Sequence, residues 1–496
     1  MRDHKLPPDL NRYTTMLPMI HNTTDWANSM FGNAQIGDTR RTNRLIDIAS
    51  RLADNTGRSA AYACDGQGSL VEGTYRFIRN EKVDASAFRR AAFDTTAALA
   101  VDRDEVWLME DTTSLSFKHG VSMKLGKLGK TTDKARGWWV HNSFMIDAET
   151  GCSLGLVHQE WWMRPDEADD TTEPESGKWA AASASVRRRF GDQMYKVITV
   201  CDREADIFAY LQEKTEQQER FVVRAKHHRH IEQADARLFT HLAEQPELGR
   251  YQLDIPQKGM LDSKGKRKNR KARTAEFSLH TTPVTFSQSG QKITLNAVFA
   301  QEQAATDDEA NLCWLLLTSE PVETYKQAMK VIHIYSQRWR VEDYHKAWKT
   351  GAGAERQRMT EPENLERMVS ILAFVGVRLM QLRESLTLAV QLKARGSLEQ
   401  AEAIESQPCT NVLTEDEWRI LWLNANKRGG RYPKKLPNEI PTLKWAYQAI
   451  GKLGGFYDSK RTGIASWATM WLGWDKLQDM LSGYYLSKET AALMGF

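Results

Sequence analysis

The sequence predicts a multidomain α/β protein, with a mixed sheet in the middle of the chain and helical segments on either side. Short apolar runs such as VWLMED and VITVCD have the length and the uninterrupted hydrophobicity of strands that are buried on both faces. A helical pattern, SGKWAAASASVRRRF, stands between them. The chain of 496 residues, 41% of them hydrophobic, is long enough for two or three domains with a sizeable core.

The segments before the sheet are expected to be an extension and a helical domain. Residues 1–22 carry prolines without periodicity, which predicts a disordered extension. Residues 23–80 have helical patterns with short loops, which predicts a compact helical domain. In the helix TRRTNRLIDIASRLA, Thr39 is the expected N-cap. The expected buried stripe of this helix consists of Leu45, Ile48, Ala49 and Leu52.

The central region, residues 81–385, should contain the sheet. After VWLMED, the segments GWWVHNSFMID and CSLGLVHQEWWM are typical of further strands, and the helical pattern precedes VITVCD. The order strand, strand, strand, helix, strand suits a ribonuclease-H-like core. Residues 227–313 are rich in strand patterns such as KITLNAVFA, which predicts an inserted β-domain. Residues 386–496 are expected to be helical.

Two carboxylates stand at the ends of the apolar runs, Asp111 in VWLMED and Asp202 in VITVCD. Because open α/β sheets place their sites at the carboxyl ends of strands, we expect both acids at one rim of the sheet. Together with Glu342 they would supply the hard oxygen ligands that Mg²⁺ or Mn²⁺ prefers. The alternative for each aspartate is an N-cap, since DTTS and DREAD both contain helix-start chemistry.

The segment IYSQRWRVEDYHKAWK concentrates charge on one side of an expected helix. At about 100° per residue, four polar side chains would project from a stripe roughly 60° wide: Tyr335, Arg338, Glu342 and Lys349. Lys346 joins the stripe, so that the positive charge exceeds what Glu342 can neutralise and an anionic partner is expected. The alternative is an ordinary solvated charged face.

The net charge of +4 is too small to indicate nucleic acid by itself, but the basic residues are clustered. Residues 264–273, KGKRKNRKAR, carry seven Lys or Arg between the strand-like segments YQLDI and AEFSLH, which predicts a basic β-hairpin tip. Phosphate contact is the favoured interpretation, and a flexible exposed loop is the alternative. The expected contacts in this segment are Lys266, Arg267, Lys268 and Arg270.

Several long motifs occur in one order along the chain: EDTTSLS around Asp111, GWWVH, QEWWMRP, VCDREAD around Asp202, and YSQRWRVEDYHKAWKTGAGAERQRM. From about residue 24 onward, the chain resembles the bacterial DDE transposases that carry a Tyr-Arg-Glu-Lys signature. The resemblance implies a cut-and-paste DNA transposase that works as a dimer on two transposon ends. It also implies a metal-binding triad, Asp111, Asp202 and Glu342, and phosphate contacts by Tyr335, Arg338 and Lys349.

The resemblance implies further features of the DNA interface. A hairpin intermediate at the transposon end would need an extruded base, and Trp314 matches the family's base-stacking tryptophan. The alternative for Trp314 is a core position on a strand. The tryptophan-rich carboxyl-terminal segment would carry dimer contacts, with core packing as the alternative. Other candidate DNA contacts are Arg224 and Lys226 after the strand FVVRAK, Arg40, Arg41 and Arg44 in the first domain, and Lys460 and Arg461 near the chain end.

The cysteine spacing and the length of the apolar runs indicate the cellular compartment. Five cysteines without a CxxC pair indicate neither a disulfide framework nor a zinc site. No apolar run approaches about 18 residues, so no membrane span is expected. We expect a bacterial cytoplasmic protein that is associated with the nucleoid. Two rival functions are a DNA-binding inhibitor that holds transposon ends without cutting, and a structure-selective nuclease on the same fold. The complete triad and signature argue against the first, and the helical amino-terminal domain and the β-insertion argue against the second.

Overall fold

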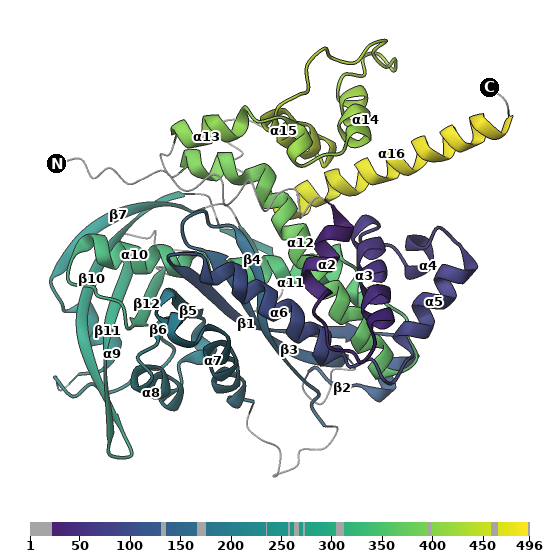
Figure 1. Ribbon diagram of the computed structural model, residues 1–496. Coiled ribbons are helices and arrows are strands. Elements are labelled where there is room, and N and C mark those ends of the chain that lie inside the picture. Colours follow the sequence, from purple (N-terminus) through teal and green to yellow (C-terminus); the bar gives the residue numbers. More distant parts are fainter. Residues whose placement is uncertain are drawn as a thin grey trace.

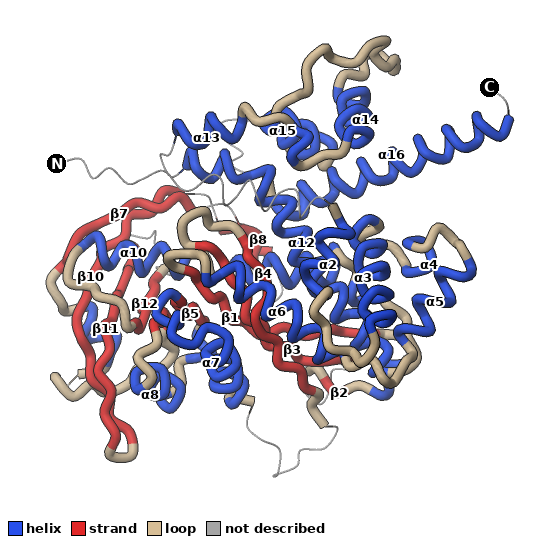
Figure 2. The backbone as a smooth tube through the Cα atoms, in the orientation of Figure 1, coloured by secondary structure: helices blue, strands red, loops and turns tan. Residues whose placement is uncertain are grey.

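The computed structural model describes residues 22–129, 135–165, 175–234, 236–255, 258–261, 267–270, 273–303, 312–394, 398–457 and 465–494. A long, twisted sheet runs through the molecule, and helices lie on both of its faces (Figures 1 and 2). None of the helices in these ranges has the length and hydropathy needed to cross a bilayer.

The amino-terminal helices are α2 (Thr23–Phe31), α3 (Thr39–Asp54), α4 (Ala60–Ala63) and α5 (Gly68–Ile78). The N-cap of α3 is Asp38 and not Thr39, because Asp38 has the extended backbone that a cap requires whereas Thr39 is already helical. The Asp38 carboxylate accepts a hydrogen bond from the amide of Arg40 at 2.8 Å. The predicted stripe on α3 is confirmed, since all four of its side chains are buried: Leu45, Ile48, Ala49 and Leu52.

The central strands are β1 (Val106–Phe117), β2 (Gly126–Lys127), β3 (Arg136–Asp147), β4 (Ser153–Trp162), β5 (Val197–Cys201) and β6 (Arg220–Arg224). Five of them lie side by side in the order β4, β3, β1, β5, β6. The pairs β4–β3 and β3–β1 are antiparallel, whereas β5 is parallel to both β1 and β6. The predicted order of three strands, a helix and a strand is present, with α7 (Gly177–Phe190) as the helix.

The strands expected in an inserted β-domain continue this same sheet. They are β7 (Glu247–Ile255), β10 (Arg273–Gln288), β11 (Gln291–Glu302) and β12 (Cys313–Thr318). Beyond β6 they follow in the order β12, β11, β10, β7, each antiparallel to its neighbour. Between β7 and β10, the strands β8 (Lys258–Leu261) and β9 (Arg267–Arg270) form a separate pair. Part of the basic segment predicted as a hairpin tip is therefore a strand.

The two faces of the central sheet are covered by different helices. Met109 of β1 shares a hydrophobic cluster with Tyr344 of α11 (Trp339–Lys346) and with α12 (Pro362–Ala394). The opposite face packs against α7 and α8 (Phe208–Glu216) through Trp179 and Tyr210. Because successive side chains of a strand alternate between faces, Asp111 shares the α11 face with Met109. The remaining helices are α6 (Ala85–Val101), α9 (Leu238–Ala243), α10 (Tyr325–Ser336), α13 (Leu398–Glu405), α14 (Glu415–Ala425), α15 (Leu443–Leu453) and α16 (Trp467–Met494).

The segment predicted as one helix from Tyr335 to Lys349 is divided. α10 ends at Ser336, and the turn that leads into α11 is tight, since the amide of Arg338 donates to the carbonyl of Tyr335 at 3.0 Å. After α11 the backbone widens into a π-helical turn, η4 (Ala347–Gly351). A tight turn and a wide turn both shift the angular positions of side chains, so a constant 100° per residue does not describe this segment.

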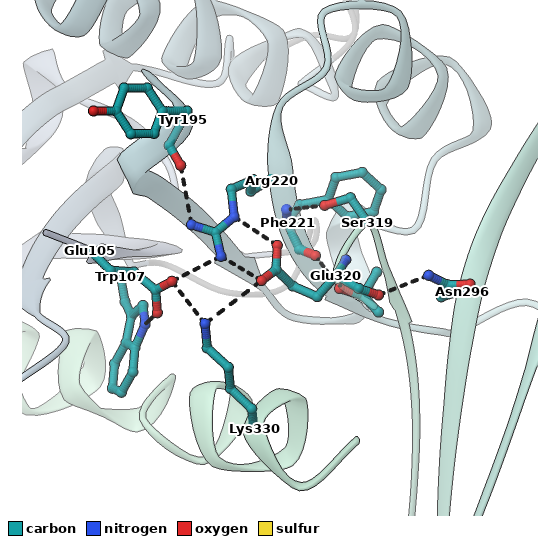
Figure 3. A network of polar contacts seen from close by, with 10 residues as sticks. Glu105, Trp107, Tyr195, Arg220, Phe221, Asn296, Ser319, Glu320 and Lys330 are labelled. Atoms are coloured by element: carbon teal, nitrogen blue, oxygen red, sulfur yellow. Dashed lines mark hydrogen bonds and ion pairs between the residues drawn. The ribbon is translucent and has the colours of Figure 1, made fainter. Parts of the chain in front are cut away.

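A network of charged side chains links α10 to the sheet at the amino-terminal ends of β1 and β6 (Figure 3). Arg220 of β6 contacts Glu105 at 2.8 Å and Glu320 at 2.5 Å. Lys330 of α10 contacts the same Glu105 at 2.8 Å. Because Glu105 precedes β1 and Glu320 follows β12, the network ties three strands to the helix that leads into α11.

Candidate active site

Two acids lie side by side where β1 and β5 stop pairing. The last paired residues of the two strands are Glu110 and Cys201, so the next residues, Asp111 and Asp202, leave the ladder together. Asp202 also caps the short 3₁₀ helix η3 (Arg203–Ala205) by accepting a hydrogen bond from the amide of Glu204 at 2.8 Å. The N-cap alternative therefore holds for Asp202, in addition to its position at the rim.

Asp111 does not end its strand, contrary to the sequence prediction. β1 continues to Phe117, still paired with β3, although its pairing with β5 has ended. The apolar run marks only the part of β1 that is covered on both faces, and beyond it buried and half-buried positions alternate. The N-cap alternative is wrong for Asp111, because its carboxylate accepts from the amide of Thr112 within a strand, at 2.9 Å.

The third acid reaches the same place from α11. The Arg338 guanidinium lies with Nη2 2.6 Å from Oε1 of Glu342 and with Nη1 3.7 Å from Oδ2 of Asp111. Arg338 is almost completely buried, at 8% exposure. One buried cation therefore links a strand acid with a helix acid.

The carboxylates influence one another electrostatically. Burial raises the pKa of the Asp111 carboxyl to about 7, and the negative charges of Asp202 and Glu342 act in the same direction. The positive charge of Arg338 opposes this rise. A buried carboxylate with two further negative charges beside it forms a place where an added cation would be stabilised.

The donor set fits a hard divalent ion, because it consists of carboxylate oxygens without thiolate or imidazole ligands. Within the described ranges, however, no three acidic, histidine or cysteine side chains are already grouped as an ion would need. The Arg338 guanidinium stands between Asp111 and Glu342. Metal binding at these acids would therefore require Arg338 to move.

Three of the residues predicted to contact DNA form a second cluster beside the acids. The ring of Trp314 meets the ring of Tyr335 edge-on, with 5.3 Å between centroids. Tyr335 is only 3% exposed. Burial raises the pKa of its phenol, and the nearby Arg224 and Arg338 oppose the rise. Arg224 itself donates to the carbonyl of Cys313 at 3.0 Å.

Lys349 also lies near the acids, on η4. Burial lowers the pKa of its ammonium group, while the charges of Glu355 and Asp111 oppose the change. Lys346, by contrast, does not join the predicted stripe: its side chain is 61% exposed and pairs with Asp343 at 3.4 Å. Lys226 is exposed. The structure thus brings Lys349 to the acids and leaves Lys346 outside.

The predicted arginines of the amino-terminal domain lie on the surface of α3. Arg40 has a side chain that is 90% exposed and pairs with Asp38. Arg41 donates to the carbonyl of Ile36 at 2.9 Å, and Arg44 pairs with Asp47 at 3.1 Å. Lys266, Lys460 and Arg461 lie outside the described residues, as do the side chains of Arg267, Lys268 and Arg270.

Two residues of this site, Trp339 and His345, were not predicted from the sequence. Trp339 is 53% exposed, and the guanidinium carbon of Arg338 lies 4.9 Å from its ring centre. His345 is buried with Nδ1 4.0 Å from Oδ2 of Asp111. Burial lowers the pKa of His345 to about 3, with help from Lys349 and Arg338, so its ring is neutral. The signal available for His345 was its position three residues after Glu342, on the same side of a helix.

Comparison with known proteins identifies two family models along the chain. A transposase DNA-binding model matches residues 23–83, which assigns DNA binding to the helical domain predicted at residues 23–80. A transposase DDE domain model matches residues 126–376, just over half of the chain; this range contains Asp202 and Glu342 and begins after Asp111.

Among solved structures, the cryo-EM structure of a piggyBac transposase synaptic complex with hairpin DNA matches at 9% identity. The match covers 79% of this chain and 78% of that chain, with a TM-score of 0.37, a level that establishes no shared fold. The two family models, which match in order along the chain, are sufficient without it. This chain is a DNA-binding transposase that belongs to the DDE transposase family.

Proposed function

We propose that this protein is a cut-and-paste transposase of the Tyr-Arg-Glu-Lys type with a ribonuclease-H-like catalytic core. It binds two transposon ends as a homodimer, cleaves them through a hairpin intermediate and joins their 3′ ends to target DNA. The observation that carries the proposal is the buried Arg338 guanidinium that links Asp111 to Glu342, beside Asp202.

The strand order supports the proposed core. A ribonuclease-H-like fold is expected to have the strand order β4, β3, β1, β5, β6. It is also expected to place one acid after the paired part of β1, one after β5 and a third on a later helix. The proposed domains are residues 23–80 for end binding, 81–385 for catalysis and 386–496 for dimerisation. The last of these contains α16, which extends away from the sheet (Figure 1).

Asp111, Asp202 and Glu342 are the proposed ligands of Mg²⁺, two ions in the working complex, with Mn²⁺ as a substitute. Such ions, when bound, activate the attacking oxygen and stabilise the departing oxygen of a phosphodiester. The fork of a guanidinium also suits phosphate, so Arg338 would exchange a carboxylate for the transposon end. Lys349, Tyr335 and Arg224 would hold neighbouring phosphates, and Trp314 would stack on an extruded base.

The test is Asp111→Ala, assayed on duplex DNA that carries the ends flanking the protein's own gene. We expect the variant to bind these ends like the wild type and to lose Mg²⁺-dependent nicking, because one of three metal ligands is gone. Asp343→Ala is the control, since Asp343 lies next to Glu342 but pairs with the exposed Lys346. Nicking by the Asp111 variant would contradict the triad, and wild-type cleavage of DNA without these ends would favour a nuclease.

A further inference from the structure

Three polar side chains form a row across the sheet at the level of Asp111. Asp111 of β1 lies opposite Asn142 of β3, which in turn lies opposite Gln159 of β4. Directly opposite residues share a face, and this face packs against α11. Asn142 is fully buried and Gln159 is 6% exposed. Burying amides costs free energy unless they are hydrogen-bonded, and both of these amides have hydrogen-bond partners.

The row continues into His345 of α11. The amide nitrogen of Gln159 donates to Oδ1 of Asn142 at 2.7 Å. The amide nitrogen of Asn142 in turn lies 3.1 Å from Nε2 of His345. Because an amide nitrogen only donates, Nε2 must accept, which places the hydrogen of the neutral ring on Nδ1. The strands therefore fix the tautomer of His345.

That Nδ1 faces the proposed metal ligand. It lies 4.0 Å from Oδ2 of Asp111, the oxygen that is also 3.7 Å from Arg338. The other oxygen, Oδ1, is held by the amide of Thr112. A separation of 4.0 Å is longer than a hydrogen bond, so a small rotation of the carboxylate is needed to close it. Once Arg338 has turned to a phosphate, His345 remains as a donor beside Oδ2.

We infer that His345 is a positioning residue, set by Asn142 and Gln159, which holds the Asp111 carboxylate in the orientation that binds the catalytic ion. This inference rests on the proposed function of Asp111 as a metal ligand. Hydrogen-bonding partners of this kind orient a ligand, and their loss typically weakens metal affinity about 10- to 100-fold.

The test compares His345→Phe, which keeps the ring volume without a donor, with His345→Asn, whose amide nitrogen can replace Nδ1. Mn²⁺ binding is measured by electron paramagnetic resonance of the free ion, on protein bound to its end DNA, together with the Mn²⁺ dependence of nicking. For His345→Phe we expect the half-saturating Mn²⁺ concentration to rise about 10- to 100-fold, with end binding unchanged. We expect His345→Asn to stay close to the wild type.

His280→Phe is the control, because His280 is a half-buried histidine of β10 whose Nδ1 lies 2.8 Å from the carbonyl oxygen of Gln245, on a strand that carries none of the three acids. It should leave the Mn²⁺ dependence unchanged. If His345→Phe does not fold, Asn142→Leu, which removes the donor to Nε2, must show the same rise. Unchanged Mn²⁺ binding in the variants, or equal losses in His345→Phe and His345→Asn, would overturn the inference.

The Asp111→Ala variant separates this inference from the proposed function. If Asp111→Ala loses nicking while the His345 variants bind Mn²⁺ like the wild type, only this inference is refuted. If Asp111→Ala still nicks DNA, the proposed triad is refuted.

Discussion

Asp111 binds a proton more tightly in the folded protein than in the unfolded chain. Burial first, and then Asp202 and Glu342, raise its pKa from 3.8 to about 7. A group whose pKa is raised by folding contributes its full stabilisation below the unfolded pKa and loses it as the pH rises through the folded pKa. This contribution is therefore complete below about pH 4 and absent above about pH 7.

Asp111→Asn should remove this dependence, because the amide does not titrate. We expect the variant and the wild type to be similarly stable near pH 4 and the variant to be more stable at pH 8, by up to about 4 kcal/mol. Urea unfolding across this pH range, in EDTA, measures the difference. A difference in unfolding free energy that stays constant from pH 4 to pH 8 would show that folding does not raise the pKa of Asp111.

Asp38→Asn is a control of opposite sign. The backbone and side-chain hydrogen bonds of Arg40 lower the pKa of Asp38, so its contribution is present at neutral pH and is lost as the pH falls. The Asn variant should thus be less stable than the wild type at pH 7 and should converge with it at low pH.

The meeting of Asp111 and Asp202 at one rim of the sheet could be predicted from the sequence, whereas the surroundings of His345 could not, for a physical reason. A carboxylate at the end of a buried apolar run is visible locally, since the run itself predicts the strand. The role of His345 depends on Asn142, which lies 203 residues earlier in the chain. Only the paired register of β1, β3 and β4 brings that amide to the ring.

The element that carries Lys349 is shaped by its contact with α12. The indole of Trp348, in η4, donates to the carbonyl of Val369 at 2.9 Å. A Cβ at Gly376 of α12 would meet the Trp348 backbone, 3.0 Å from Cα and 3.1 Å from N. The absence of a side chain at Gly376 therefore allows α12 to approach the π-turn.

Gly376→Ala should consequently destabilise the protein, although alanine is the better helix former. Gly483→Ala in α16 is the matched control, because a Cβ there meets nothing within 4 Å and the substitution should gain up to about 1 kcal/mol. Thermal unfolding of the two variants measures the contrast, and nicking should fall in Gly376→Ala alone. Equal stabilisation of both variants would mean that the turn is not held by this contact.

At the scale of elements, the sequence predicts which residues are helical better than it predicts the angular positions of their side chains around the helix. The residues from Tyr335 to Lys349 are helical almost throughout, as predicted, yet the tight turn at Arg338 and the π-turn after α11 are set by packing on β12 and α12. The predicted grouping of four side chains is present near the acids, although they do not lie on one straight helix: Tyr335, Arg338, Glu342 and Lys349. The prediction for Lys346 is wrong, because its exposed ammonium group pairs with Asp343 at 3.4 Å.

At the scale of the whole molecule, segments far apart in the chain meet on one surface. Arg58, from the loop before α4, pairs with Asp479 and lies 3.8 Å from Asp475, both on α16. The hydroxyl of Tyr62 lies 3.4 Å from that of Ser482. No local pattern predicts such a contact, since the hydrogen-bonded residues are more than 400 positions apart.

Arg58→Ala should loosen α16 without unfolding the protein. The pair is partly exposed, so its loss should cost no more than about 1 kcal/mol. We expect faster amide hydrogen exchange in residues 475–482 and little change in the thermal midpoint. Arg76→Ala, which removes only an exposed pair with Glu72 inside α5, should leave exchange in α16 as it is. Identical exchange in both variants would exclude a role for Arg58 in docking α16.

The continuity of the sheet through β12, β11, β10 and β7 limits how this enzyme can be shortened. An insertion that folded by itself could be excised, and its flanking ends rejoined, to give a smaller tool for delivering DNA. Here excision would strip β12 of its partner β11 and leave the backbone groups of an apolar strand open to pairing with other molecules. A miniaturised version should therefore keep every strand of this sheet.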